Sequence, residues 1–151
     1  AALADKYRDQ IVRLQADFEN FRKRINRERE ENAQAALEGT LKKLVPLLDD
    51  FERALATNPK DANPAAVEGV NLVFQKLRAT LIELGLEEIS ALGQVFNPHL
   101  HEAIAQFYSE QQPEGTVIEQ ARKGYKIGQR LLRPASVVVS KGKATEDLSG
   151  E

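Results

Sequence analysis

The sequence contains no cysteine, which excludes disulfide bonds, thiolate metal sites and cysteine nucleophiles. It also has no tryptophan, and only 6% of its residues are aromatic while 29% are charged. That balance favours long solvated helices over a single round core. Basic and acidic residues nearly cancel, with 21 against 23 and a formal net charge of −2. The chain therefore lacks the strong positive field that would attract bulk nucleic acid or an anionic membrane.

Long hydrophobic runs are also missing. The longest candidates, such as residues 44–48, fall far short of the roughly 18 residues that a membrane helix needs. The start of the sequence has no signal-peptide pattern, and it opens directly on a helical pattern. We therefore expect no membrane association, and we expect that a leader segment precedes these residues in the natural chain.

No constellation of residues predicts catalysis. His99 and His101 are the only histidines, and on a strand they would share one face, which is half of a zinc site. Glu102 is adjacent, but no third ligand is evident, and Asn97 before a proline favours a turn. A packed or capping role for the histidines is the favoured interpretation. Because there is also no glycine-rich phosphate loop, we expect no enzyme, metal or cofactor.

The first third of the chain has the pattern of one long helix. Apolar residues recur there at spacings of four and three over three heptads, and no glycine or proline occurs before Gly39. A helix over residues 1–38 would be roughly 50 Å long at 1.5 Å per residue. Such a helix is too long to pack against a domain this small, so we expect it to pair with its own copy in a homodimer. The polar stretch 26–32 interrupts the apolar seam.

Residues 39–85 predict a helical hairpin. Gly39 and Thr40 suggest a break or a bend, with a second helix that tolerates Pro46 near its start. Residues 57–64 then read as a loop, and a third helix follows over residues 65–84 with Gly85 as its cap. Two such hairpins would form a four-helix bundle across the dimer. The predicted dimer interface consists of Tyr7, Ile11, Leu14, Phe18, Phe21, Ile25, Leu41, Leu44, Leu48, Phe51, Phe74 and Leu77.

After Gly85 the pattern changes to short strands separated by turn residues. The expected strands cover residues 86–90, 101–108, 116–123, 124–128 and 130–141. Alternation predicts that Val117, Glu119 and Ala121 share one face of their strand. The predicted fold is thus α+β, with a small all-β domain over residues 86–143 and a flexible tail over residues 144–151.

The one basic cluster, residues 21–29, suggests a basic leucine-zipper protein as an alternative. Two features oppose it: the apolar seam precedes the basic residues instead of following them, and acidic residues interleave with them, which would repel phosphate. We expect no nucleic-acid binding. The physical pattern alone indicates an elongated homodimer that binds another protein, and a structural coiled-coil scaffold remains open.

Several segments, in order along the chain, resemble those of the GrpE family. The segments are ADFENFRKR (16–24), LVPLLDDFERAL (44–55), VEGVNLVFQKL (67–77), VFNPHLHEAI (95–104) and GTVIEQARKGYKIGQRLLRPASVVVSK (115–141). The resemblance implies a homodimer of paired long helices, a central four-helix bundle and two β-wing domains. It also implies a nucleotide exchange factor that binds the nucleotide-binding domain of a DnaK-type chaperone, opens its cleft and releases ADP without binding nucleotide itself.

The resemblance further implies a cytoplasmic location in a bacterium, or an organelle matrix or stroma in a eukaryote. By their positions in the family motifs, Arg22, Gly69, Arg130 and Val139 match chaperone-contact residues. Each has a plainer alternative: a solvated arginine, a glycine that eases helix packing, a turn cap and a core valine. Gln129 stands where the family often has glycine, which puts the turn before Arg130 in doubt.

Overall fold

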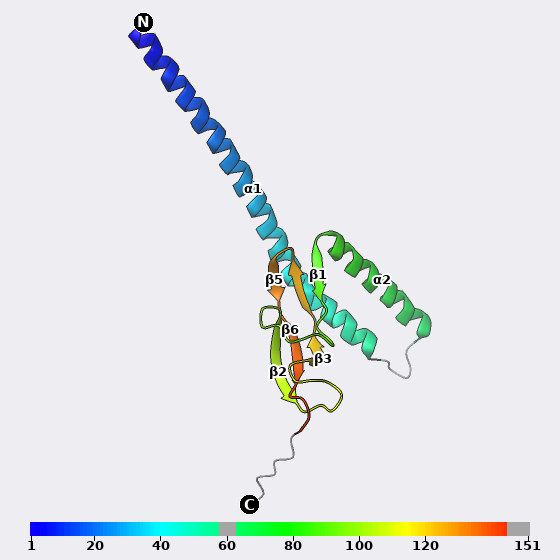
Figure 1. Cartoon of the computed structure of the whole chain (residues 1–151). Coiled ribbons are helices and arrows are strands. Elements are labelled where there is room, and N and C mark those ends of the chain that lie inside the picture. Colours follow the sequence, from blue (N-terminus) through cyan, green and yellow to red (C-terminus); the bar gives the residue numbers. More distant parts are fainter. Residues whose placement is uncertain (58–62, 145–151) are drawn as a thin grey trace, which may run out of the picture. The chain divides into compact units, whose positions relative to one another are not determined.

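The computed structural model describes residues 1–57 and 63–144. This part of the chain forms two helices followed by six strands, which confirms the α+β class (Figure 1). It divides into two compact units, residues 1–39 and the chain from Thr40 onward. The elements are helices α1 (Ala2–Ala56) and α2 (Pro64–Glu83) and strands β1 (Leu86–Ile89), β2 (His101–Phe107), β3 (Val117–Arg122), β4 (Gly124–Ile127), β5 (Arg130–Arg133) and β6 (Ala135–Ser140).

Helix α1 runs through Gly39 and Pro46 without ending, so of the predicted break or bend at Gly39 and Thr40 the break is wrong. Gly39 does not adopt a positive φ, and a glycine with helical dihedrals costs a helix only about 1 kcal/mol. The apolar residues that flank it continue the helical spacing, and Leu41 is fully buried. Pro46 is exposed, and its missing N–H removes only the bond to the carbonyl of Lys42.

In residues 1–39 almost every side chain is exposed, and only Ile25, Leu37 and Glu38 are half-buried. Apart from Ile25, the predicted seam residues are largely exposed to solvent, from 48% for Phe21 to 69% for Leu14. The pairing of this helix with a second copy remains a prediction, since the structure contains one chain.

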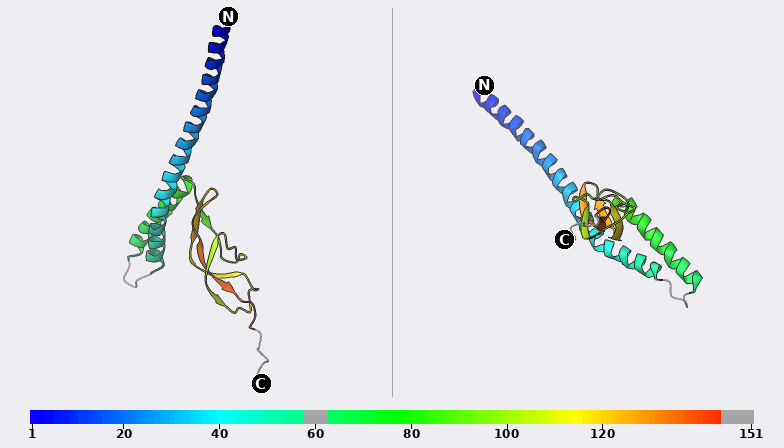
Figure 2. Two further views of the ribbon diagram at one scale, coloured as in Figure 1. Left: turned by 90° about the vertical axis from the view of Figure 1, so that its left-hand side faces the viewer. Right: turned by 60° about the horizontal axis from the view of Figure 1, so that its bottom comes forward.

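The second unit begins with the predicted helical hairpin. Phe51 of α1 stacks on Phe74 of α2, with ring centroids 5.8 Å apart. The Asn63 side chain accepts a bond of 3.0 Å from the Ala65 N–H, and Pro64 starts α2, as expected at a helix N-terminus. Figures 1 and 2 both show α2 running back beside the end of α1. Most of the predicted loop over residues 57–64 lies outside the described residues.

The six strands form two three-stranded sheets, ordered β1-β4-β5 and β2-β6-β3. Strand β2 pairs with β6 in parallel, whereas the other three pairings are antiparallel. The predicted strand over residues 130–141 is two strands in the structure. Pro134 separates them, because proline lacks the N–H that a sheet requires. The main core cluster of the β domain includes residues from both sheets, and it consists of Ile89, Ala91, Val117, Ala135, Val137 and Val139.

Strand β3 does not alternate as predicted. Val117 is buried, but Glu119 and Ala121 are exposed. The pairing with β6 shifts register between Val117 and Glu119 and again between Gln120 and Arg122. These irregularities rotate the side chains out of strict alternation, as β-bulges do.

The two sheets meet where the chain passes from one to the other. Lys123 links β3 to β4, and Pro134 links β5 to β6. Gly124 lies so close to this second link that a Cβ would stand 2.5 Å from the Ala135 backbone nitrogen. Only glycine permits that approach, so the junction of the sheets is a tightly packed point of the fold.

Candidate functional site

The hairpin formed by β4 and β5 carries the first candidate residue, Arg130. Gly128 and Gln129 form its two-residue loop, and Gly128 has a φ of +55°. A glycine in the first loop position is typical of a type II′ turn, which matches the twist of the strands. Because Gly128 takes the positive φ, Gln129 is accommodated without strain. Arg130 begins β5 with an exposed side chain, beside Leu131, which is 39% exposed.

Gly69 lies on an exposed stretch of α2, and a Cβ built there would meet no heavy atom within 4 Å. Packing within the chain therefore does not require a glycine, and the plainer alternative, that it eases helix packing, is left only for helices of two different chains. A mid-helix glycine still costs the helix about 1 kcal/mol relative to alanine. Leu72, one turn along the helix, is 65% exposed.

Arg22 belongs to the other unit and is exposed. Its neighbour Arg24 lies over the Phe21 ring, 5.5 Å from the ring centroid, and approaches Glu28 at 4.0 Å. Both members of that ion pair are more than half exposed, so it adds little to stability. Arg22 thus stands on a solvated helix face, and its chaperone contact remains a prediction.

Val139 does not present a contact surface. It is the last residue but one of β6, is 6% exposed, and belongs to the core cluster of the β domain. Since an alternating strand buries half of its side chains, the core interpretation applies here. We therefore remove Val139 from the candidate contact residues, and the contact predicted for it would require a partly opened domain.

The predicted dimer residues of the hairpin differ in exposure. Leu41, Leu48 and Phe74 are buried within the chain itself and have at most 5% of their surface to offer a partner. Leu44, Phe51 and Leu77 are half-buried. The apolar residues that the hairpin leaves most exposed were missed from the sequence, although their helical spacing places several beside the buried stripe. They are Leu47, Val70, Leu72, Val73, Ile82 and Leu84.

The histidine pair does not converge on a metal. His101 is 6% exposed, and its Nδ1 accepts a bond of 3.0 Å from the Asn97 N–H. The Asn97 side chain in turn accepts from the His99 N–H at 2.9 Å, which caps the turn. Burial lowers the pKa of His101 below its ordinary value. Within residues 1–57 and 63–144 no group of three or more potential ligands could hold a metal ion.

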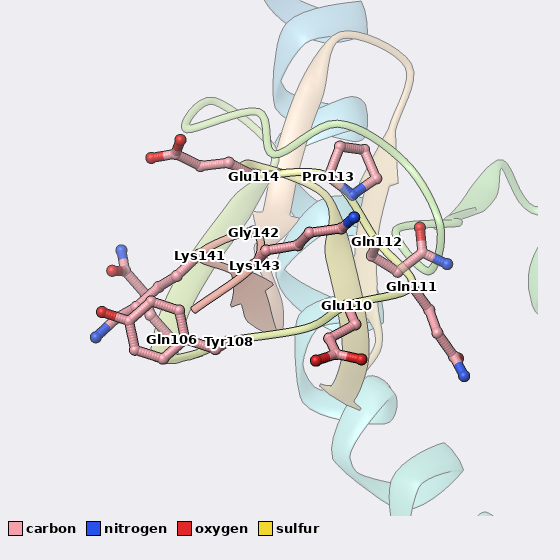
Figure 3. A pocket seen from close by; sticks show the side chains of 10 residues that line it. All are labelled: Gln106, Tyr108, Glu110, Gln111, Gln112, Pro113, Glu114, Lys141, Gly142 and Lys143. Atoms are coloured by element: carbon pink, nitrogen blue, oxygen red, sulfur yellow. The ribbon is translucent and has the colours of Figure 1, made fainter. Parts of the chain in front are cut away.

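A hollow of about 800 Å³ lies at the end of β2 and β6 (Figure 3). Its lining is mostly polar, and its side chains point in different directions instead of converging on one spot. Such a hollow lacks the convergent groups of an active site. The lining residues are Gln106, Tyr108, Glu110, Gln111, Gln112, Pro113, Glu114, Lys141, Gly142 and Lys143. Neither of the two described helices is long and apolar enough to cross a membrane.

Comparison with known proteins adds the family. The GrpE family model matches residues 2–141, which include both helices and all six described strands. The chain is 36% identical over 137 residues to Protein GrpE of Oceanobacillus iheyensis, covering 91% of this chain and 72% of that protein. For Protein GrpE of Syntrophobacter fumaroxidans the identity is 41% over 134 residues, with coverages of 88% and 71%.

A third relative, Protein GrpE of Carboxydothermus hydrogenoformans, is 48% identical over 131 residues, covering 86% of this chain and 66% of that protein. Each of these matches extends over most of the chain, so it includes helical and β segments together. The chain therefore belongs to the GrpE family, whose members are co-chaperones that serve DnaK-type chaperones as nucleotide exchange factors.

Proposed function

We propose that this chain acts as a homodimer that binds the nucleotide-binding domain of a DnaK-type chaperone, opens its cleft and accelerates the release of ADP. The family match over residues 2–141 carries this proposal, because it covers the helices and the β domain in one continuous stretch. The protein performs no bond chemistry in this scheme. It binds the open chaperone more tightly than the closed one, so that nucleotide and exchange factor weaken each other's binding.

The proposed chaperone contact consists of Arg130, Gly69 and Arg22. Arg130 stands at the exposed end of the β4–β5 hairpin, in whose turn Gly128 takes the positive φ. Gly69 provides a stretch of helix without a side chain, onto which a partner can pack closely. Arginine at an exposed, preorganised position is a common anchor of protein interfaces, because its planar group forms several directed bonds.

The test is the release of a fluorescent ADP analogue from a DnaK-type chaperone, followed by stopped flow with and without the protein. We expect acceleration by the native chain, and a weaker effect for Arg130→Ala. Arg53→Ala is the matched control, because Arg53 is exposed on α1 and its guanidinium group pairs with Asp50, three residues away on the same helix. If both variants lose the same part of the acceleration, the lost positive charge causes the effect, and not a contact of Arg130 with the chaperone.

A coiled-coil scaffold without exchange activity is the alternative. It rests on the apolar seam of residues 1–25, which would serve a purely structural dimer equally well. A folded dimer that leaves the ADP release rate of several DnaK-type chaperones unchanged would favour this alternative.

A further inference from the structure

The β domain is attached to α1 by two carboxylates on one turn of the helix. Asp49 binds the guanidinium group of Arg133 through both of its oxygens, one of them at 2.6 Å from Nη2. Glu52 accepts from the Lys123 ammonium at 2.8 Å. Arg122 also approaches Asp49, at 3.6 Å. We call these five residues the carboxylate anchor.

One pair of the anchor, Asp49 with Arg133, is better shielded from water than an ordinary surface ion pair. The Arg133 side chain is only 12% exposed and that of Asp49 only 19%, so water screens their attraction little. A two-pronged arginine–carboxylate contact also fixes direction, because both groups are planar. Arg133 is held further by its Nε, which donates to the Lys123 carbonyl at 2.7 Å, and by the Tyr125 ring, whose centroid lies 5.2 Å away.

The anchor holds the point where the two sheets meet. Arg122 ends β3 of one sheet, Arg133 ends β5 of the other, and Lys123 is the link between β3 and β4. The bond from Arg133 to the Lys123 carbonyl ties these segments together. One turn of α1 therefore binds both sheets at their junction, next to the close approach of Gly124 and Ala135.

The contact around the anchor is not continuous packing. A hollow of about 460 Å³ lies on one side, lined by Asp49, Glu52 and residues of β3, and one of about 200 Å³ lies beside Val45, Pro46 and Leu132. A contact with gaps loses the dispersion attraction that a filled interface would supply. Directed ion pairs therefore add to what fixes the angle of the β domain against the helical hairpin, beside the buried apolar residues Val45 and Leu48.

Strand β5 connects the anchor to the proposed chaperone contact. Arg133 ends this strand, Arg130 begins it, and three residues of strand span roughly 10 Å. A small rotation at Arg133 consequently moves Arg130. The other two-pronged pair, Arg78 with Glu88 at 2.6 and 2.8 Å, joins α2 to β1 close to the chain connection itself and restrains this rotation less.

We propose that Asp49 and Glu52 are positioning residues that hold the β domain at the angle at which Arg130 meets the chaperone. This proposal rests on the proposed function. Without the anchor the domain samples a wider range of angles, and only part of the population is ready to bind. The apparent dissociation constant then rises by the inverse of the competent fraction, while the complex, once formed, is unchanged.

The test compares two double variants with equal loss of charge. Asp49→Asn/Glu52→Gln removes the anchor, whereas Asp50→Asn/Glu83→Gln neutralises two exposed carboxylates of the hairpin as the control. In the ADP-release measurement we expect the anchor variant to need about tenfold more protein for half-maximal acceleration, if a tenth of the population stays competent. Its maximal rate at saturation should stay within twofold of the native rate, and the control should match the native protein.

The angle itself is measured without the chaperone. Because the chain has no cysteine, Gln75→Cys on α2 and Gln106→Cys on β2 give a unique pair of spin-label sites, both exposed. Labelled chain is diluted with excess unlabelled chain, so that only distances within one chain are recorded. We expect a narrow distance distribution for the native protein and the control, and a broad one for the anchor variant.

Unchanged distances, or broadened distances with unchanged half-maximal concentration, would overturn the proposal. A lowered maximal rate with the same half-maximal concentration would also overturn it, since the anchor would then act in cleft opening. If the anchor variant does not fold, the test uses Glu52→Lys and the charge exchange Glu52→Lys/Lys123→Glu. Only the exchange restores the ion pair, so it alone should restore the half-maximal concentration and the narrow distance distribution. If the native chain fails to accelerate release, the proposed function fails, and the distances still test the anchor.

Discussion

At the scale of single residues, His101 couples the stability of the β domain to pH. Its Nδ1 accepts the Asn97 N–H, and a protonated ring can no longer accept. Burial lowers its pKa in the folded state, so below the ordinary histidine value of about 6.5 the unfolded chain binds more protons than the folded one. The free energy of unfolding should therefore fall as pH decreases through that value toward the lower folded pKa.

Chemical denaturation between pH 7.5 and 5.5 measures this dependence. We expect His101→Gln, whose side-chain oxygen can also accept the Asn97 N–H, to lose much of the pH dependence in this window. His99→Gln serves as the control, because His99 is exposed. An identical pH profile for His101→Gln and the native protein would mean that protonation at His101 does not limit stability.

Gly69 should separate stability from binding. Gly69→Ala adds a methyl group into open space on α2 and removes the entropic penalty of glycine, so it should stabilise the protein by about 1 kcal/mol. If the chaperone packs against this stretch, the same methyl group should weaken binding. Gly39→Ala is the control, since Gly39 is also helical and also faces open space.

Thermal unfolding and titration with the chaperone give the two readouts for Gly69→Ala. Greater stability combined with lower affinity would support the contact. Greater stability with unchanged affinity would remove Gly69 from the chaperone site. In both cases we expect the control Gly39→Ala to be more stable than the native protein and to bind the chaperone with the native affinity.

At the scale of elements, the first half of α1 offers an apolar seam whose partner can be tested. Phe18 lies on this seam, whereas Val12, which is 64% exposed, lies about 140° around the helix from Tyr7 if each residue turns 100°. Phe18→Asp should shift the mass measured by sedimentation from dimer to monomer, because it would bury a charge between two helices. Val12→Asp should leave the mass unchanged. A monomeric native chain would end the dimer proposal.

The helices and strands show where sequence reasoning succeeds. Turn residues marked four of the five predicted strand regions correctly, the fifth being two strands, and Asn63, Pro64 and Gly85 marked the limits of α2. Gly39 misled the prediction because a helix tolerates one glycine when the neighbouring apolar residues keep their spacing. The parallel pairing of β2 with β6 could not be predicted from the sequence, because local patterns do not reveal which strands become neighbours.

The carboxylate anchor illustrates the same limit at the site. Asp49 and Arg133 are 84 residues apart, and each looks like an ordinary surface residue in the sequence. Asp49 next to Asp50 gave no sign that one carboxylate is mostly covered and the other exposed. Exposed candidates such as Arg130 were found only because they match a family motif, and the same matching suggested Val139, which the structure buries.

At the scale of the whole molecule, the two units should unfold separately. Residues 1–39 bury almost nothing within their own chain, whereas the second unit has its own core. Tyr125 in that core is fully buried, and its near-ultraviolet circular dichroism reports on packing there. We expect helix signal to be lost in two steps on heating, with the Tyr125 signal lost only in the second.

Protein concentration identifies the first step. If residues 1–39 are held by pairing between chains, the first midpoint should rise with concentration by mass action, and the second should rise less. A single coincident transition at every concentration would show that the units unfold together.

The order of strands also bears on how the protein is made. Strand β6 lies between β2 and β3, and it is the last of the six strands to leave the ribosome. Neither β2 nor β3 has a partner in that sheet until residues 135–140 have been synthesised. The helical hairpin, whose contacts are local, can form well before this point. A nascent chain halted just before Ala135 would therefore carry a folded hairpin and a sheet that lacks its central strand, and it would be the form most exposed to proteolysis and aggregation.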